Sequence, residues 1–167
     1  MTRARWWLLG ILWLAVALRF YRVAEMPLRA DEASSLFLAL RDPQAIVREF
    51  IVNDPHMPLY FLIVHYWTGC AGISELAARF PAIFVGVLCV ALTYTLGRQL
   101  FPRRRSIALL GAALVALNPF LIWDAQDIYM YSALTATTLV SFNWFLYVLR
   151  PDNRWWHWLA YILSSAA

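Results

Sequence analysis

The sequence contains no lysine and few charged residues of any kind. All fourteen basic residues are arginine, and charged residues make up only 14% of the 167 positions. An average soluble domain carries about 25% charged residues. The arginines stand between apolar runs and form no continuous basic face. This pattern excludes nucleic acid as a partner and suggests that the arginines set membrane topology.

Cysteine is also scarce, with only two residues. Cys70 and Cys89 both lie in apolar surroundings, with neither CxxC spacing nor a nearby histidine cluster. We interpret both as small hydrophobic residues rather than as a disulfide or a zinc site. The sequence also lacks internal repeats and low-complexity tracts. Its unusual composition therefore comes from its long apolar segments.

Apolar residues are present in excess, at 62% of the chain, and the nine Trp and eight Tyr gather near the ends of apolar runs. A single core of this size does not bury so much apolar surface, which makes lipid the expected solvent. We predict an all-α integral membrane protein, a polytopic helical bundle of about five transmembrane helices. The predicted spans are residues 6–23, 80–97, 107–123, 128–149 and 155–167.

The first and last of these runs each need a closer look, because neither is an ordinary transmembrane span. Residues 6–23 could form a signal peptide, but Arg19 and Arg22 close the run and no small-x-small cleavage site is evident. We therefore expect a retained span, with both arginines reaching the membrane interface. Residues 155–167 are fewer than the ~20 that a crossing helix needs. We accordingly expect a truncated last span and a chain that is a fragment.

A sixth run, residues 57–72, decides the topology. It begins near Pro58, and its length suits an interfacial helix better than a span. If the run is interfacial and the N-terminus is cytoplasmic, eight arginines face the cytoplasm and nine of the ten acids face outside, as the positive-inside rule requires. The first loop, about residues 24–79, and the turn 124–127 then share the outer face. Two more interfacial helices are predicted in that loop, at residues 31–40 and 43–52.

Acidic residues on the outer face are the first candidates for chemistry. Asp31 and Glu32 could deprotonate an acceptor hydroxyl or hold a divalent ion, or they could simply favour a helix N-terminus. Asp124 and Asp127 flank a tight interhelical turn at membrane depth, where acids usually have a function or a specific partner.

Two cationic side chains on the same face are the second set. His56 could bind an anion when it is protonated, or it could cap a turn. Arg79 could pair with a lipid phosphate, or it could only extend toward the interface.

Five motifs occur in an order that resembles the GT-C glycosyltransferases, in the branch that includes bacterial protein O-mannosyltransferase-like enzymes and lipid A aminoarabinose transferases. The motifs are Asp31-Glu32, His56-Met57-Pro58-Leu59-Tyr60, Gly72 with Glu75-Leu76-Ala77-Ala78-Arg79-Phe80-Pro81, Gly97-Arg98-Gln99-Leu100-Phe101, and Asn118-Pro119-Phe120-Leu121 with Gln126-Asp127-Ile128-Tyr129-Met130-Tyr131. This chain departs from the family pattern at Met57, where a proline is usual, and at Gln126 and Tyr129, where arginines are usual.

The resemblance implies that residues 1–167 are the N-terminal transmembrane module of such an enzyme, located in the cytoplasmic membrane. The implied reaction moves a hexosyl or pentosyl group from a polyprenyl-phosphate-sugar donor to a hydroxyl or other nucleophile of a glycan, lipid or protein at the outer face.

The resemblance also implies roles for individual residues. Asp31 would be the general base, with Glu32 assisting, and Asp127 would complete the acidic site. His56 and Arg79 would lie near the donor phosphate, whose charge grows as it leaves. No cofactor is expected, although Asp31 and Asp127 could together hold a divalent cation.

Two alternatives remain. One is a non-catalytic remnant or membrane partner with the same fold, because the further helices that close the carrier and acceptor cavities in the family are missing from this sequence. The other is a transporter or flippase, although acids confined to the outer interface argue against transport.

Overall fold

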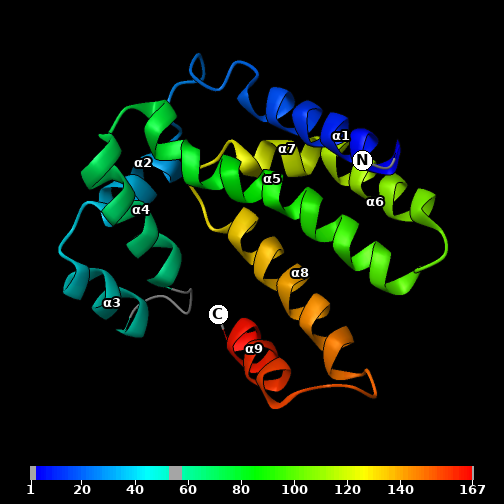
Figure 1. Cartoon of the computed structure of the whole chain (residues 1–167). Coiled ribbons are helices and arrows are strands. Elements are labelled where there is room, and N and C mark those ends of the chain that lie inside the picture. Colours follow the sequence, from blue (N-terminus) through cyan, green and yellow to red (C-terminus); the bar gives the residue numbers. More distant parts are fainter. Residues whose placement is uncertain (1–2, 53–57, 167) are drawn as a thin grey trace.

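The longest helix, α5, lies at the centre of this computed structural model, which describes residues 3–52 and 58–166 (Figure 1). Within those residues every regular element is a helix, so the prediction of an all-α fold is confirmed. The elements are α1 (Arg3–Phe20), α2 (Ala30–Ala39), α3 (Pro43–Val52), α4 (Pro58–Ala71), α5 (Glu75–Leu100), α6 (Arg105–Leu117), α7 (Pro119–Ala125), α8 (Tyr131–Val148) and α9 (Trp155–Ala166).

Helix α5 packs against neighbours on several sides. Helices α1, α6 and α7 lie along one flank of α5, α8 packs against another, and α9 packs against α8 (Figure 1). Among the described helices, α5 alone is long and apolar enough to cross a membrane, and α6 with α7 meets the same criterion only as a bent pair. The bundle of about five spans therefore stays a prediction.

The predicted third span, residues 107–123, is not one straight helix. Helices α6 and α7 meet there at an angle of 60°. Pro119 has no N–H to offer the Val115 carbonyl, and its ring disfavours a continuous helix. The Asn118 side chain then caps α7 by accepting the Phe120 N–H at 2.9 Å. The Asn-Pro pair breaks the helix even though the run is apolar throughout.

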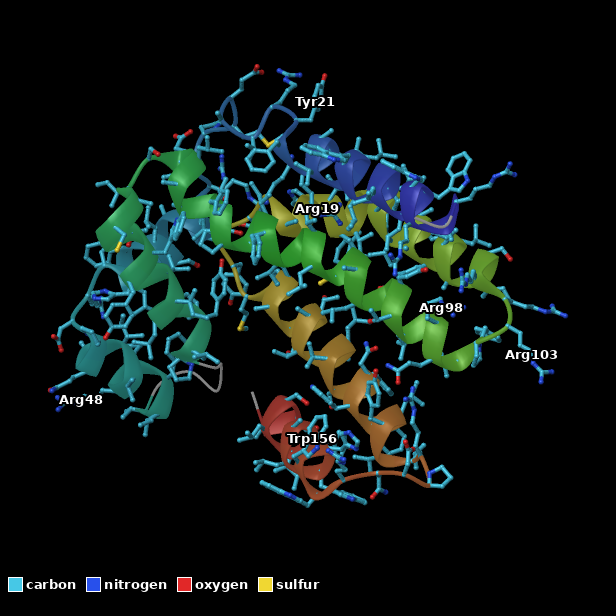
Figure 2. All side chains as sticks on the ribbon, viewed as in Figure 1. Arg19, Tyr21, Arg48, Arg98, Arg103 and Trp156 are labelled. Atoms are coloured by element: carbon cyan, nitrogen blue, oxygen red, sulfur yellow. The ribbon has the colours of Figure 1, made fainter. Side chains whose placement is uncertain are left out.

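Arg19 bonds the carbonyls that this break releases. Its side chain was predicted to reach the membrane interface, and that prediction was wrong, because the residue is fully buried between α1 and its neighbours (Figure 2). Nη2 donates to the Val115 carbonyl and Nη1 to the Ala116 carbonyl, each at 3.4 Å. Gly86 of α5 leaves room for this side chain, since a Cβ there would lie 3.0 Å from Arg19 Nε.

The first loop folds into three helices beside one end of α5. The predicted helices at residues 31–40, 43–52 and 57–72 are present as α2, α3 and α4. Helix α4 has 14 residues and is about 21 Å long, which is short of the ~30 Å hydrocarbon core of a bilayer. Its length fits the predicted interfacial placement.

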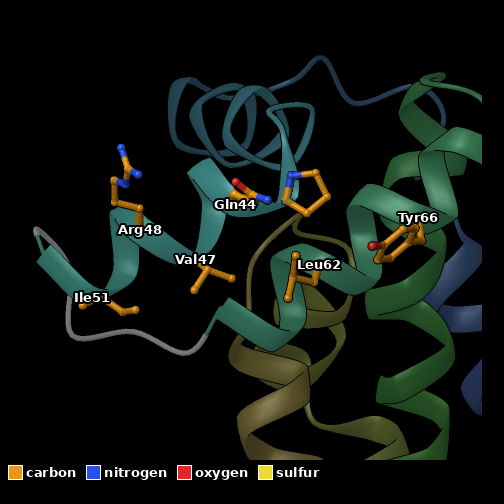
Figure 3. A pocket seen from close by; sticks show the side chains of 7 residues that line it. Gln44, Val47, Arg48, Ile51, Leu62 and Tyr66 are labelled. Atoms are coloured by element: carbon orange, nitrogen blue, oxygen red, sulfur yellow. The ribbon is translucent and has the colours of Figure 1, made fainter.

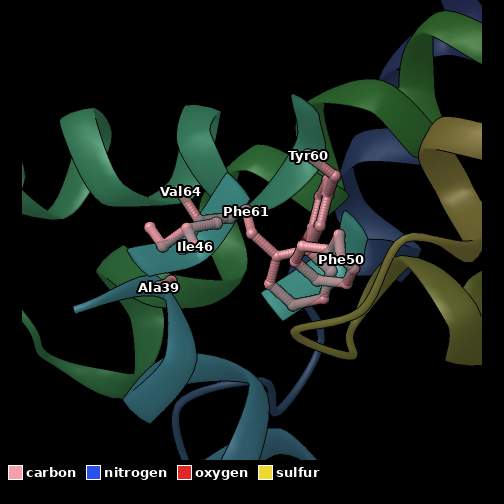
Figure 4. Close-up of a cluster of buried hydrophobic side chains, with 6 residues drawn as sticks. All are labelled: Ala39, Ile46, Phe50, Tyr60, Phe61 and Val64. Carbon is pink, nitrogen blue, oxygen red and sulfur yellow. The ribbon is translucent and has the colours of Figure 1, made fainter. Parts of the chain in front are cut away.

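A small apolar core holds these three helices together (Figure 4). The rings of Phe50 on α3 and Phe61 on α4 lie 4.8 Å apart. The buried members of this core are Ala39, Ile46, Phe50, Tyr60, Phe61 and Val64. Met130 and Ala133, from the start of α8, pack against the same core. The first loop is thereby joined to the turn that follows α7.

The two ends of α5 carry different polar groups. Arg98 and Arg103 lie at the Leu100 end, far from Arg48 on α3 (Figure 2). Near the same end, Arg150 donates to Gln99 Oε1 at 3.2 Å. The first loop and the turn after α7 meet at the Glu75 end instead. This separation of charged groups agrees with the topology that the arginine pattern predicts.

Candidate functional site

A buried ion pair fixes the start of α2 against α5. Arg79 Nε donates to Glu32 Oε1 and Arg79 Nη2 donates to Glu32 Oε2, both at 2.8 Å. Each residue is only 2% exposed. A guanidinium that meets a carboxylate through two parallel hydrogen bonds is among the strongest side-chain contacts in proteins. The pair joins residues that are 47 positions apart in the chain.

Arg79 also holds the segment between α1 and α2. Its Nη1 donates to the carbonyls of Val23 at 2.7 Å and Met26 at 2.8 Å, and its Nη2 donates to the Pro27 carbonyl at 3.4 Å. These bonds and the Glu32 pair use all the N–H donors of a guanidinium. Arg79 was predicted to lie near the donor phosphate, and in this arrangement it has no N–H left for that contact. The geometry is that of a positioning residue.

Glu32 joins three parts of the chain. Besides Arg79 of α5, its carboxylate accepts the backbone N–H of Arg29 at 3.1 Å and that of Ile128 at 3.3 Å. Burial opposes ionisation of Glu32, but the hydrogen bonds and charge of Arg79 and the two backbone N–H groups hold the pKa of this carboxyl below its ordinary value. Its partners make Glu32 an anchor rather than an open base.

A second, more open group of charges lies next to this anchor. Arg29 Nη2 lies 2.8 Å from Asp31 Oδ2, and Arg29 Nη1 lies 3.7 Å from Asp127 Oδ2. The Asp31 and Arg29 side chains are 52% and 45% exposed, and that of Asp127 is 12% exposed. The Arg29 guanidinium also lies over the Trp123 ring, 5.0 Å from its centroid. We call Arg29, Asp31 and Asp127 the outer cluster.

Asp127 differs electrostatically from an ordinary surface acid. Burial raises the pKa of Asp127 to about 6; the negative charges of Glu32 and Asp31 add to the rise, and Arg29 and Arg79 oppose it. A carboxylate with a pKa near ambient pH is a stronger proton acceptor than an ordinary one. Such shifts are typical of functional sites, although structural charge networks also produce them.

The structure brings most of the predicted site residues together. Asp31, Glu32, Arg79 and Asp127 meet where α2, α5 and the turn after α7 converge, while His56 lies outside the described residues. Sequence reasoning missed Arg29, whose position two residues before Asp31 was the available signal.

Gln126 and Tyr129 stand where the family pattern has arginines, and both contact neighbouring parts of the chain. Gln126 donates through Nε2 to the carbonyls of Arg19 and Tyr21, both at 3.1 Å, and so ties the end of α1 to the turn after α7. The Tyr129 ring lies 6.4 Å from the Phe61 ring of α4. Both side chains contact neighbouring elements of the chain itself.

The charge balance of the outer cluster bears on metal binding. Within residues 3–52 and 58–166, no group of three or more His, Cys, Asp or Glu side chains has the arrangement of a metal site. The Arg29 guanidinium lies within ion-pair distance of both Asp31 and Asp127. Arg29 therefore supplies positive charge beside both acids.

Comparison with known families adds one match. The model of a family described as dolichyl-phosphate-mannose-protein mannosyltransferase matches residues 44–167, which is more than half of the chain. The matched region includes Arg79 and Asp127 and begins after Asp31 and Glu32. Comparisons with curated proteins and with solved structures gave no match.

Proposed function

The chain belongs to the dolichyl-phosphate-mannose-protein mannosyltransferase family, and we propose that it is the N-terminal transmembrane module, residues 1–167, of a polyprenyl-phosphate-dependent glycosyltransferase. The family supports glycosyl transfer of the mannosyltransferase type. The finer proposal is transfer of a hexosyl or pentosyl group to a hydroxyl or other nucleophile at the outer face of the membrane. The observation that carries it is the outer cluster, in which two acids and a half-exposed arginine meet.

The outer cluster has the groups that such a reaction needs. An attacking hydroxyl becomes more nucleophilic when a carboxylate accepts its proton, and Asp31 is the most exposed carboxylate there. The hydroxyl oxygen bonds to the anomeric carbon, the bond from that carbon to the phosphate oxygen breaks, and the polyprenyl phosphate leaves with the electron pair. Asp127 provides a second proton acceptor, because its pKa is about 6.

Arg29 is the residue that we assign to the leaving phosphate. A cation beside the leaving oxygen offsets the negative charge that grows in the transition state. The Arg29 side chain is 45% exposed, whereas every N–H of Arg79 is engaged inside the chain. Arg79 then acts indirectly, by fixing Glu32 and the start of α2. A contact from His56 remains part of the proposal.

The membrane arrangement is part of the same proposal. We infer a multi-pass protein of the cytoplasmic membrane with a cytoplasmic N-terminus, because α5 can span and the polar groups divide between its two ends. Natural Cys70 on α4 is exposed and Cys89 on α5 is buried. An impermeant maleimide added to intact cells should therefore label Cys70. Arg104→Cys in a Cys70→Ser background should label only after the cells are opened. Reversed labelling would contradict the shared outer face.

The test of function is sugar transfer from a labelled polyprenyl-phosphate-sugar by the full-length protein in liposomes. We expect transfer by the natural protein, and a loss of at least 10-fold in kcat/KM with Arg29→Gln, since the variant removes the charge beside the phosphate. Arg22→Gln is the matched control, because the Arg22 side chain is also exposed, at 60%, but pairs with Glu25. No transfer by the natural protein, or equal losses in both variants, would contradict the proposal.

A further inference from the structure

An apolar groove runs beside the outer cluster. It has a volume of about 400 Å³ and lies among α4, α5, α8 and α9. Its walls come mainly from aliphatic side chains, among them Leu59, Ile63, Leu88, Met130 and Leu134. Leu59, Ile63, Leu88 and Leu134 are well exposed, so the groove is open along its length. We call it the α4–α8 groove.

One polar group stands out among these apolar walls. Tyr60 lines the α4–α8 groove and is 5% exposed, yet its hydroxyl has no hydrogen-bond partner among the described residues. Proteins seldom leave a buried hydroxyl unpaired, because it loses its bond to water without gaining another. An unpaired donor at the wall of a groove is therefore a candidate contact for a ligand.

Tyr60 lies close to the outer cluster. Met130, three residues after Asp127, packs against the core that contains Tyr60 and also lines the groove. Burial raises the pKa of the Tyr60 hydroxyl, and the charges of Asp127 and Glu32 raise it further. The group therefore stays protonated at neutral pH and remains a hydrogen-bond donor.

We propose that the Tyr60 hydroxyl donates a hydrogen bond to the phosphosugar head group of the donor, and that the α4–α8 groove holds the isoprenoid chain of the same molecule. The proposal rests on the proposed function and adds a binding residue and a path for the carrier. A polyprenyl phosphate joins a polar head to a long hydrocarbon chain. The groove and its surroundings offer matching groups: aliphatic walls, one unpaired hydroxyl, and the charges of the nearby outer cluster.

The dimensions of the groove support this occupant. Its lining on α8 extends from Met130 to Val140, which is about 15 Å of helix. That length takes several isoprene units, and the chain then continues into the lipid through the open side. A hydrocarbon chain needs no hydrogen bonds from the walls, and the aliphatic lining provides few.

Tyr60→Phe tests the hydroxyl directly. The change removes one buried oxygen that has no partner within residues 3–52 and 58–166, so thermal stability should stay the same or rise. We expect the KM for a labelled polyprenyl-phosphate-sugar to rise about 10-fold, the usual worth of a hydrogen bond to a charged group. Tyr66→Phe is the matched control, because Tyr66 is 65% exposed and faces a different groove, between α3 and α4 (Figure 3). That control should leave KM and kcat unchanged.

Thr137→Phe tests the groove. Thr137 lines the α4–α8 groove, and a phenyl ring there would fill part of the path of the carrier. We expect the KM to rise several-fold for a donor with a long isoprenoid chain and to change little for a two-isoprene analogue. Thr138→Phe is the control, since Thr138 is the next residue on α8 and does not line this groove. Equal effects on both chain lengths would overturn the assignment and point to another occupant, such as a further helix.

The outcomes separate this inference from the proposed function. If the natural protein transfers sugar but Tyr60→Phe keeps a normal KM, the inference fails and the proposed function stands. If Tyr60→Phe loses thermal stability together with activity, the hydroxyl has a structural partner and the inference also fails. If the natural protein transfers no sugar, the proposed function itself fails.

Discussion

Two fully buried arginines, Arg79 and Arg19, contact different kinds of groups in two regions of the molecule. At the Glu75 end of α5, Arg79 meets the Glu32 carboxylate and backbone carbonyls, with its main contacts at 2.7–2.8 Å. Near the break between α6 and α7, Arg19 reaches only carbonyls at 3.4 Å, and its Nε has no partner within the described residues. One guanidinium is saturated and the other is not.

The difference shows what each region requires. A buried carboxylate needs an opposite charge and several hydrogen bonds, and Arg79 gives Glu32 both. A broken helix exposes carbonyls without any charge to balance, and a long side chain with several donors can reach them. The Glu75 end of α5 is therefore held by a specific ion pair, whereas the break between α6 and α7 is held by longer hydrogen bonds. The two arginines should respond differently to substitution.

Arg79→Met should have the largest effect. Methionine preserves much of the volume but leaves the Glu32 carboxylate buried without its partner, which typically destabilises a protein by about 3–5 kcal/mol. Unfolding in detergent, followed by circular dichroism, measures this loss. The double variant Arg79→Met with Glu32→Met should recover part of the stability. An unchanged midpoint in the single variant would contradict the anchoring role.

Arg19→Met should have a smaller effect, about 1–3 kcal/mol, since it leaves two carbonyls unpaired but no buried charge. The same unfolding measurement compares the two arginine variants directly. A loss as large as that of Arg79→Met would mean that the contrast between a saturated and an unsaturated guanidinium does not govern stability here.

Asp127→Asn should increase stability at pH 7.5 by about 1–3 kcal/mol, a prediction that follows from its raised pKa. The folded-state pKa is about 6 and the ordinary value is 3.8. Ionisation of Asp127 therefore lowers stability as pH rises between these values, and the penalty is fully present above about pH 6. The gain in the variant should disappear below about pH 4. Asp152→Asn, in an exposed turn, is the control for a charge change alone.

A loss of turnover in Asp127→Asn that accompanies the gain in stability would assign Asp127 to the active site, because stabilising substitutions that lower activity are typical of functional residues. If Asp127→Asn were neither more stable at pH 7.5 nor less active, the charge of Asp127 would not destabilise the fold and its carboxylate would take no part in the reaction.

Asn118→Ala should have the smallest effect, about 1 kcal/mol, the usual worth of an N-cap. It removes the acceptor for the Phe120 N–H at the start of α7. Asn118→Asp keeps an acceptor oxygen and serves as the control. Equal melting temperatures for Asn118→Ala and the natural protein would show that Pro119 alone sets the break.

Local signals in the sequence predicted much of the fold. Pro43 and Pro58 mark the starts of α3 and α4, where proline suits the first helical turn. The apolar run at residues 107–123 hid the break at Asn118-Pro119, because hydropathy takes no account of a missing N–H. The burial of Arg19 was also missed, since its partners lie about 97 positions away in the chain.

The candidate site was predicted less completely, for a similar reason. Adjacent residues on a helix point about 100° apart, so Asp31 and Glu32 had to face different surroundings. The sequence alone does not show which of them faces Arg79, 47 positions away. The structure buries Glu32 and leaves Asp31 half exposed. The acidic pair is thus one buried anchor and one half-exposed carboxylate.

Sugar release from a labelled polyprenyl-phosphate donor by the full-length protein with Asp31→Asn tests most directly whether Asp31 is the general base. The change keeps the shape of the side chain and removes its basicity, so expression and unfolding should stay close to normal. Turnover should fall by about 10²–10⁴-fold, the usual worth of a positioned general base. Asp42→Asn, in the same loop, is the control and should release sugar normally. Near-normal turnover in Asp31→Asn would show that Asp31 is not the general base and would leave it as a helix-start acid paired with Arg29.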